Sequence, residues 1–90
     1  MNDAVKHFQS AVEANPSFGS GYLYLAKALL DAGELQDSEH AALKGLQSNP
    51  EPQVKPLGHY VLADVYTRMG RERDAARQVA LGRRLERGGT

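Results

Sequence analysis

Apolar residues recur along this chain at steps of three and four, in runs separated by proline and glycine. One run carries Tyr22, Leu25, Leu29 and Ala32, and a later run carries Leu62, Val65, Tyr66 and Met69. Such steps place the side chains on one face of an α-helix. Because β-branched residues are scattered rather than alternating with polar ones, the pattern predicts an all-α fold.

Proline and glycine mark where the helices should end. Asn15-Pro16 and Asn49-Pro50 stop helices, because proline pushes the residue before it out of the helical region. Gly33 and Gly70 follow apolar runs, where a left-handed C-terminal cap is expected. These marks predict five helices, over residues 3–14, 19–32, 35–48, 55–69 and 72–87.

The later part of the chain repeats the pattern of the earlier part. Counterparts 34 residues apart are Phe8 and Ala42, Ala11 and Gly45, and Pro16 and Pro50. Counterparts 37 residues apart are Leu25 and Leu62, Ala26 and Ala63, Leu29 and Tyr66, Gly33 and Gly70, Ser38 and Ala75, Ala42 and Val79, and Gly45 and Gly82. A period of this size indicates stacked helical hairpins, since a single hairpin cannot bury its own apolar face.

These residues resemble the tetratricopeptide repeat (TPR) family, whose unit is a helical hairpin of about 34 residues with the pattern W-x-x-L-G-x-x-Y…A-x-x-x-F…P. In this chain "YLYLAKAL" and "HYVLADVY" resemble the first-helix half of the family pattern, and "AVKHFQSAVEANP" resembles its second-helix half. His59 departs from the pattern in the bulky opening place, as do Ser38, Gly45 and Gly82 at alanine places.

The resemblance implies a right-handed α-solenoid of antiparallel hairpins in one domain over residues 1–90. Residues 3–16 would be the second helix of a partial repeat, 17–50 a full repeat, and 51–90 a full repeat with a C-terminal cap.

Small residues mark the expected contacts between helices. Ala26 with Ser38, and Ala63 with Ala75, stand where the two helices of each hairpin should approach most closely. Gly45 and Gly82 weaken their helices, and we interpret them as allowing close approach of the next helix.

The two ends of the chain are expected to differ. Ala4 would receive a first helix that is absent, whereas Arg83 stands where Val12 and Leu46 stand in the other copies. A polar outer face suits a terminal cap. The chain is therefore expected to be the final part of a longer array, or to form a homodimer through Val5 and Phe8.

In the TPR family the first helices line a concave groove that holds peptides. By register, the groove here would be lined by Ser20, Leu23, Tyr24, Lys27, Leu30, Asp31, Leu57, Tyr60, Val61, Asp64, Thr67 and Arg68. The residues expected to bind a partner are Leu23, Tyr24, Lys27, Asp31, Tyr60, Asp64 and Arg68. Of these, Leu23, Tyr24 and Tyr60 are expected to be exposed. The carboxylate clamp of one TPR subgroup is not expected, since the groove positions hold Leu23, Lys27, Tyr60, Val61 and Asp64 and no Asn is among them.

The leading functional hypothesis is a scaffold module that binds a protein or peptide through this groove. Self-association is one alternative, and a structural spacer in a larger multidomain protein is another.

No catalytic, cofactor or metal site is expected. The chain has no cysteine, and its three histidines form no pair at metal-ligand spacing. "FGSGYL" lacks a preceding strand and a third glycine, so it does not predict a dinucleotide site.

Charge is divided unevenly along the chain. Residues 1–67 carry four lysines and eight acids, a balance of −4, and residues 68–90 carry seven arginines and three acids, a balance of +4. We interpret the arginines as a solvated face, with an acidic protein partner as the alternative. Nucleic acid is not expected, because no aromatic residue follows Tyr66 to stack on bases. The sequence shows no membrane span or signal peptide, and a cytoplasmic location is expected.

Overall fold

Five α-helices make up the computed structural model, which describes residues 3–88. They are α1 (Asp3–Ala14), α2 (Gly19–Asp31), α3 (Leu35–Gln47), α4 (Lys55–Arg68) and α5 (Glu72–Glu86). No strand occurs within these residues. The all-α prediction is confirmed, and every predicted helix end lies within one residue of the observed end. Residues 1–2 and 89–90 of the expected domain lie outside the described part.

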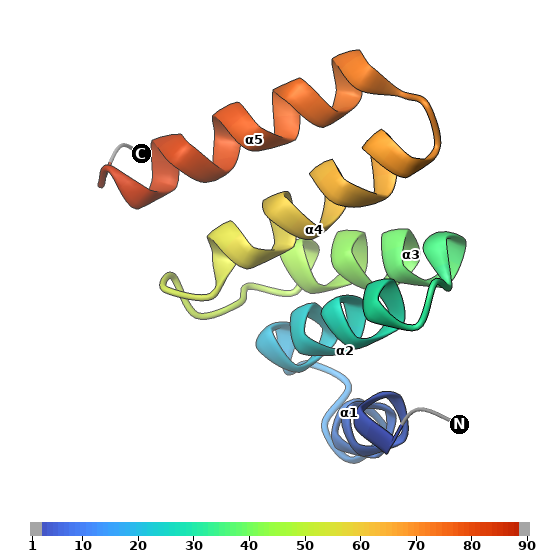
Figure 1. Ribbon diagram of the computed structural model, residues 1–90. Coiled ribbons are helices and arrows are strands. Elements are labelled where there is room, and N and C mark those ends of the chain that lie inside the picture. The colour runs from blue at the N-terminus through green and yellow to red at the C-terminus, as the bar shows by residue number, and fades with distance from the viewer. Residues whose placement is uncertain (1–2, 89–90) are drawn as a thin grey trace.

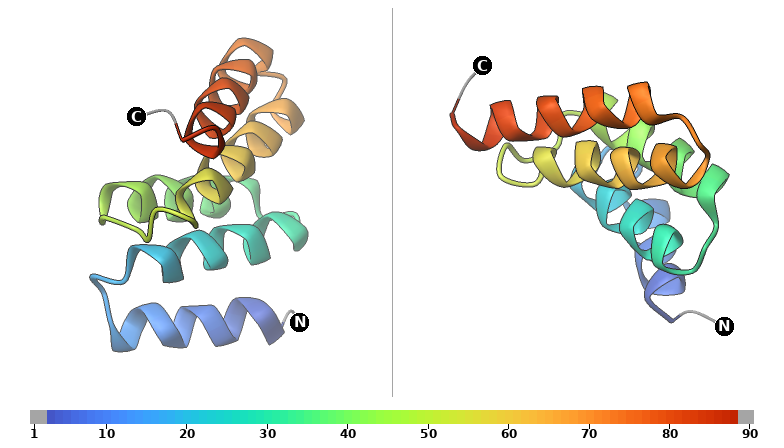
Figure 2. Two further views of the ribbon diagram at one scale, coloured as in Figure 1. Left: turned by 90° about the vertical axis from the view of Figure 1, so that its left-hand side faces the viewer. Right: turned by 45° about the horizontal axis from the view of Figure 1, so that its top comes forward.

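The helices follow one another from α1 at one end of the molecule to α5 at the other, and from α2 onward consecutive helices run in opposite directions (Figure 1). The left view of Figure 2 shows that α1 and α2 also run in opposite directions. The N- and C-terminal ends lie far apart in the further views as well (Figure 2). α2 contacts α3 and α4, and α3 also contacts α4. Among the described helices, α1 contacts α2 alone and α5 contacts α4 alone. Three central helices are therefore flanked by one helix at each end. The right-handed solenoid stays a prediction.

Two identical turns close the α2–α3 and α4–α5 hairpins. Gly33 and Gly70 have φ angles of 81° and 79°, which is the left-handed region that glycine adopts most readily. The N–H of Glu34 donates to the carbonyl of Leu29 at 2.9 Å, and that of Arg71 donates to Tyr66 at 2.8 Å. These are the six-to-one bonds of a Schellman motif. The predicted caps are confirmed at both glycines.

The first full hairpin closes on the predicted small residues. Ser38 is completely buried in α3, and its hydroxyl donates to the carbonyl of Ala26 in α2 at 2.7 Å. In the second hairpin Ala63 and Ala75 are each 6% exposed. The expected close contact is confirmed for Ala26 and Ser38, whose hydroxyl is buried with its hydrogen bond satisfied. For Ala63 and Ala75 the burial agrees with the expectation.

Glycines also set the spacing within each hairpin. A Cβ on Gly45 would lie 2.6 Å from Cδ2 of Leu23 and 2.8 Å from the backbone oxygen of Gly19, both in α2. A Cβ on Gly82 would lie 2.7 Å from the ring of Tyr60 in α4. The expectation that these glycines allow close approach of the next helix is wrong. Each allows close approach of the preceding helix of its own hairpin, because a large side chain of that helix fills the space beside the glycine.

We predict that Gly45→Ala lowers the free energy of unfolding by about 1–3 kcal/mol, despite the better helix propensity of alanine. Its methyl group would press on the backbone of Gly19, which cannot move without shifting α2. Gly82→Ala is the matched control, since there only a half-buried ring must move. Urea denaturation measures both variants, and equal destabilisation would contradict the role given to the backbone contact.

Candidate binding surface

One row of predicted groove residues points outward from α2. Tyr24, Lys27 and Asp31 follow one another at steps of three and four, and all three are exposed. Nζ of Lys27 lies 2.7 Å from Oδ1 of Asp31. The opposite side of the helix is buried, so this row is the part of α2 that solvent reaches.

A matching row lies on α4. Asp64 and Arg68 are exposed, and Nε of Arg68 lies 3.1 Å from Oδ1 of Asp64. Nη1 of Arg68 also donates to the carbonyl of Leu30 in α2, at 3.5 Å. This bond places the two rows side by side across the contact between α2 and α4. We call the five residues Tyr24, Lys27, Asp31, Asp64 and Arg68 the α2–α4 face.

The charges of this face cancel within the chain. Lys27 and Asp31 recur 37 residues later as Asp64 and Arg68, with the order of the charges reversed. Each pair has about half of its side-chain surface exposed, so each contributes at most about 1 kcal/mol to stability. The face is therefore polar without carrying a net charge.

Two of the predicted partner-binding residues do not belong to this face. Leu23 is completely buried over Gly45, and Tyr60 is half-buried over Gly82. Their predicted exposure is wrong. Leu23 stands three residues before Ala26, and Tyr60 three before Ala63, so each shares the helix side that meets the hairpin partner. The sequence held a sign of this burial, because in both hairpins a large residue of the first helix precedes a glycine of the second helix by 22 positions.

An aromatic pair stands at one end of the face. The rings of Tyr24 and Phe8 stack with centroids 5.7 Å apart, and the ring of His7 meets Phe8 edge-on at 5.1 Å. Val5 and Phe8 are half-buried against the core formed with α2. Tyr24 itself remains 38% exposed, so α1 extends the face with one partly accessible aromatic surface.

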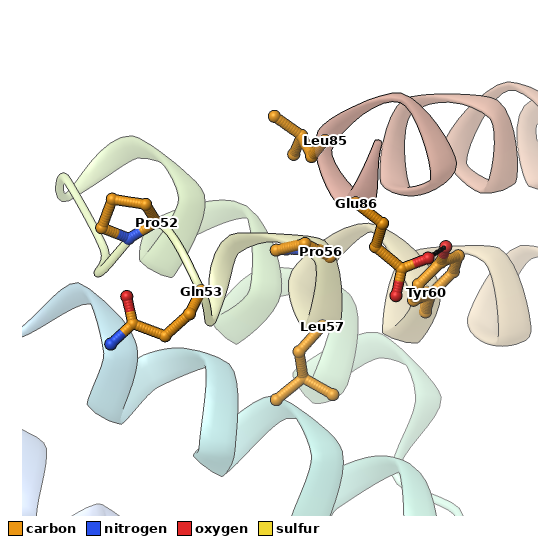
Figure 3. A pocket seen from close by; sticks show the side chains of 7 residues that line it. All are labelled: Pro52, Gln53, Pro56, Leu57, Tyr60, Leu85 and Glu86. Carbon is orange, nitrogen blue, oxygen red and sulfur yellow. Dashed lines mark hydrogen bonds between the residues drawn. The ribbon is translucent and has the colours of Figure 1, made fainter. Parts of the chain in front are cut away.

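The structure also forms a hollow that the sequence did not indicate. It has a volume of about 630 Å³ and is lined by Pro52, Gln53, Pro56, Leu57, Tyr60, Leu85 and Glu86. Figure 3 shows these side chains coming from the α3–α4 connection, the start of α4 and the end of α5. Leu57 and Tyr60 were expected in the groove. The others were missed, because no sequence spacing relates the end of α5 to the start of α4.

A hydrogen bond spans one side of this hollow. The hydroxyl of Tyr60 donates to Oε1 of Glu86 (Figure 3). This bond raises the pKa of Tyr60 above its ordinary value of 10.0, and burial and the negative charge of Glu86 raise it further. Arg83 and Arg87 oppose the shift. The neutral form of Tyr60 is thus favoured by folding.

We predict that Glu86→Gln lowers the pKa of Tyr60, because the charged acceptor is lost. In the parent chain the stabilisation from a raised pKa is present below pH 10 and is lost as pH rises through the shifted value. A tyrosine absorbance titration of the parent, Glu86→Gln and Tyr60→Phe chains measures this. If the parent and Glu86→Gln chains titrate identically, the hydrogen bond has no effect in solution.

Other chemistry is sparse in residues 3–88. His7 and His40 are exposed, and Nδ1 of His59 lies 2.8 Å from Oε1 of Gln78. No group of three His, Cys, Asp or Glu side chains in this range could hold a metal ion. None of the helices described is long and apolar enough to cross a bilayer.

Comparison of the chain with protein-family models, with curated proteins and with solved structures finds no match. The resemblance to the TPR family therefore stays a prediction from the repeated residues.

Proposed function

We propose that this chain is a TPR-like module that binds a peptide or a partner domain through the α2–α4 face. The repeated residues, the small residues at the hairpin contacts and the outward rows on the two first helices support the proposal. The observation that carries it is the exposure of Tyr24, a large aromatic residue amid paired charges. Partly exposed aromatic side chains are frequent anchors in protein interfaces.

The chemistry of the face limits the kinds of partner that it can bind. Because the positive and negative charges within each ion pair cancel, the face gives no long-range attraction to a highly charged peptide. The free part of the Tyr24 ring favours an apolar or aromatic side chain, with polar groups reaching the flanking charges. Binding should thus depend only weakly on salt.

The proposal is tested with peptides selected from a displayed random library on the immobilised chain. We expect Tyr24→Ala to weaken their binding about tenfold or more, since truncating an aromatic anchor commonly costs more than 1.4 kcal/mol. Leu43→Ala is the matched control, because Leu43 on α3 is 39% exposed, nearly the same fraction as Tyr24. Titration calorimetry measures both variants.

If Leu43→Ala weakens binding and Tyr24→Ala does not, the binding face lies on α3. Circular dichroism of both variants shows whether their helices remain intact, so that a loss of affinity is separated from a loss of structure.

Self-association is the second candidate, favoured by a comparison of α1 with α3. His7, Phe8 and Ala11 correspond to Ala41, Ala42 and Gly45, 34 residues later. The three α3 residues are buried, Gly45 against Leu23 of α2, whereas His7 is exposed and Phe8 and Ala11 are half-buried. The side of α1 that corresponds to a hairpin contact is therefore open to a second copy.

For this candidate we predict that His7→Glu dissociates the dimer, because a charge would enter the contact. Gln9→Glu adds the same charge on the solvent side of α1, and should leave the dimer intact. Analytical ultracentrifugation over a range of concentrations measures the mass. A parent chain that is monomeric at every concentration rules out self-association.

A further inference from the structure

Three arginines line the outer side of the last helix. Arg73, Arg77, Ala80 and Arg84 follow at steps of four, three and four, and all four are exposed. At 100° per residue they share one side of α5, opposite the buried Ala75 and Gly82 that face α4. We call these four residues the arginine stripe. Since α5 contacts α4 alone among the described helices, its outer side is open.

The repeat supplies an internal reference for this surface. The residues 37 positions earlier are Gln36, His40, Leu43 and Gln47, which are likewise exposed on the outer side of α3. An outer helix of this fold therefore needs no arginine at these places. The charge of the stripe is a property of α5 in particular.

The stability of α5 does not account for the charge. Arg73 lies in the first turn, where the helix dipole disfavours a cation, and Arg73 and Arg77 repel each other at a spacing of four. Arg84, in the last turn, is the only member that the dipole favours. Within residues 3–88 the only ion pair of the stripe joins Arg77 to Asp74 at 3.7 Å. Asp74 pairs more closely with Arg71, at 2.9 Å.

We propose that the arginine stripe docks an acidic helix of a partner protein. Steps of four, three and four form the seam along which two helices pack side by side. Ala80 is small and stands between Arg77 and Arg84, so a second helix can approach there. Carboxylates at matching steps on the partner would receive paired hydrogen bonds from the guanidinium groups.

The flanks of the stripe favour discrete carboxylates over a continuous polyanion. Glu72, Asp74 and Glu86 belong to the same helix and would repel a phosphate backbone laid along it. No aromatic residue follows Tyr66, so bases have no stacking platform. An acidic helix can instead leave neutral residues opposite these acids.

The probe is a synthetic helical peptide with glutamates at steps of four, three and four along one side. We expect fluorescence anisotropy to detect binding that weakens about tenfold when salt is raised from low to high ionic strength. A peptide of the same composition, with the glutamates scattered around the helix, should bind at least about tenfold less tightly. Single-stranded RNA and vesicles containing phosphatidylserine serve as the competing ligands.

The variant carries Arg73→Gln, Arg77→Gln and Arg84→Gln together. Glutamine is the residue that α3 has at the places of Arg73 and Arg84, and it is neutral like His40 at the place of Arg77. It should lose binding of the peptide and melt at the same or a higher temperature, since repulsion within α5 is relieved. The control is Lys6→Gln, Lys44→Gln and Lys55→Gln, which removes the same charge outside the stripe and should retain binding.

Three outcomes overturn the proposal: equal binding of both peptides, undiminished binding by the arginine variant, or tighter binding of RNA or vesicles than of the peptide. The Tyr24→Ala result is independent of all three, because Tyr24 lies on α2 and the stripe lies on α5.

Discussion

The contact of a large side chain with a glycine in the opposite helix sets the geometry of both hairpins. Leu23 fills the space over Gly45, and Tyr60 fills it over Gly82. A side chain on either glycine would separate the helices. With α2 and α3 held at this distance, the hydroxyl of Ser38 reaches the carbonyl of Ala26. The outward directions of the remaining residues on α2 and α4 follow from that placement, so the α2–α4 face depends on an interaction buried beneath it.

Local features of the sequence were sufficient to predict the helices and their ends. Gly33 and Gly70 end two helices through bonds within six residues, and such bonds depend little on distant parts of the chain. The exposure of Leu23 and Tyr60 was predicted wrongly for a different reason. Periodicity shows that a helix has a buried side, but the position of a neighbouring helix decides how far that side extends. The hollow near Tyr60 combines three segments, and no local pattern could have shown it.

The molecule presents two outer surfaces with different electrostatics. On the α2–α4 face each cation has an anion of the same helix beside it, so the field decays within a short distance. On α5 the arginines of the arginine stripe lie along one side of the helix, and Asp74, paired with Arg77, is the one acid that neutralises any of their charge among the described residues. The arginine stripe on α5 can therefore attract opposite charge over a long range. The α2–α4 face can interact only with groups in direct contact with it. One small chain with no net charge thus carries one surface of each kind.

The paired Schellman turns also bear on how the chain folds. Each connects helices adjacent in sequence, and the contacts of α2 with α3 and of α4 with α5 span short stretches of chain. Contacts between residues close in sequence cost the chain little loop-closure entropy, and proteins rich in such contacts fold rapidly. Each hairpin can thus be an early folding unit, with the meeting of α2 and α4 as the later step. The two hairpins would form first, and their packing against each other would follow.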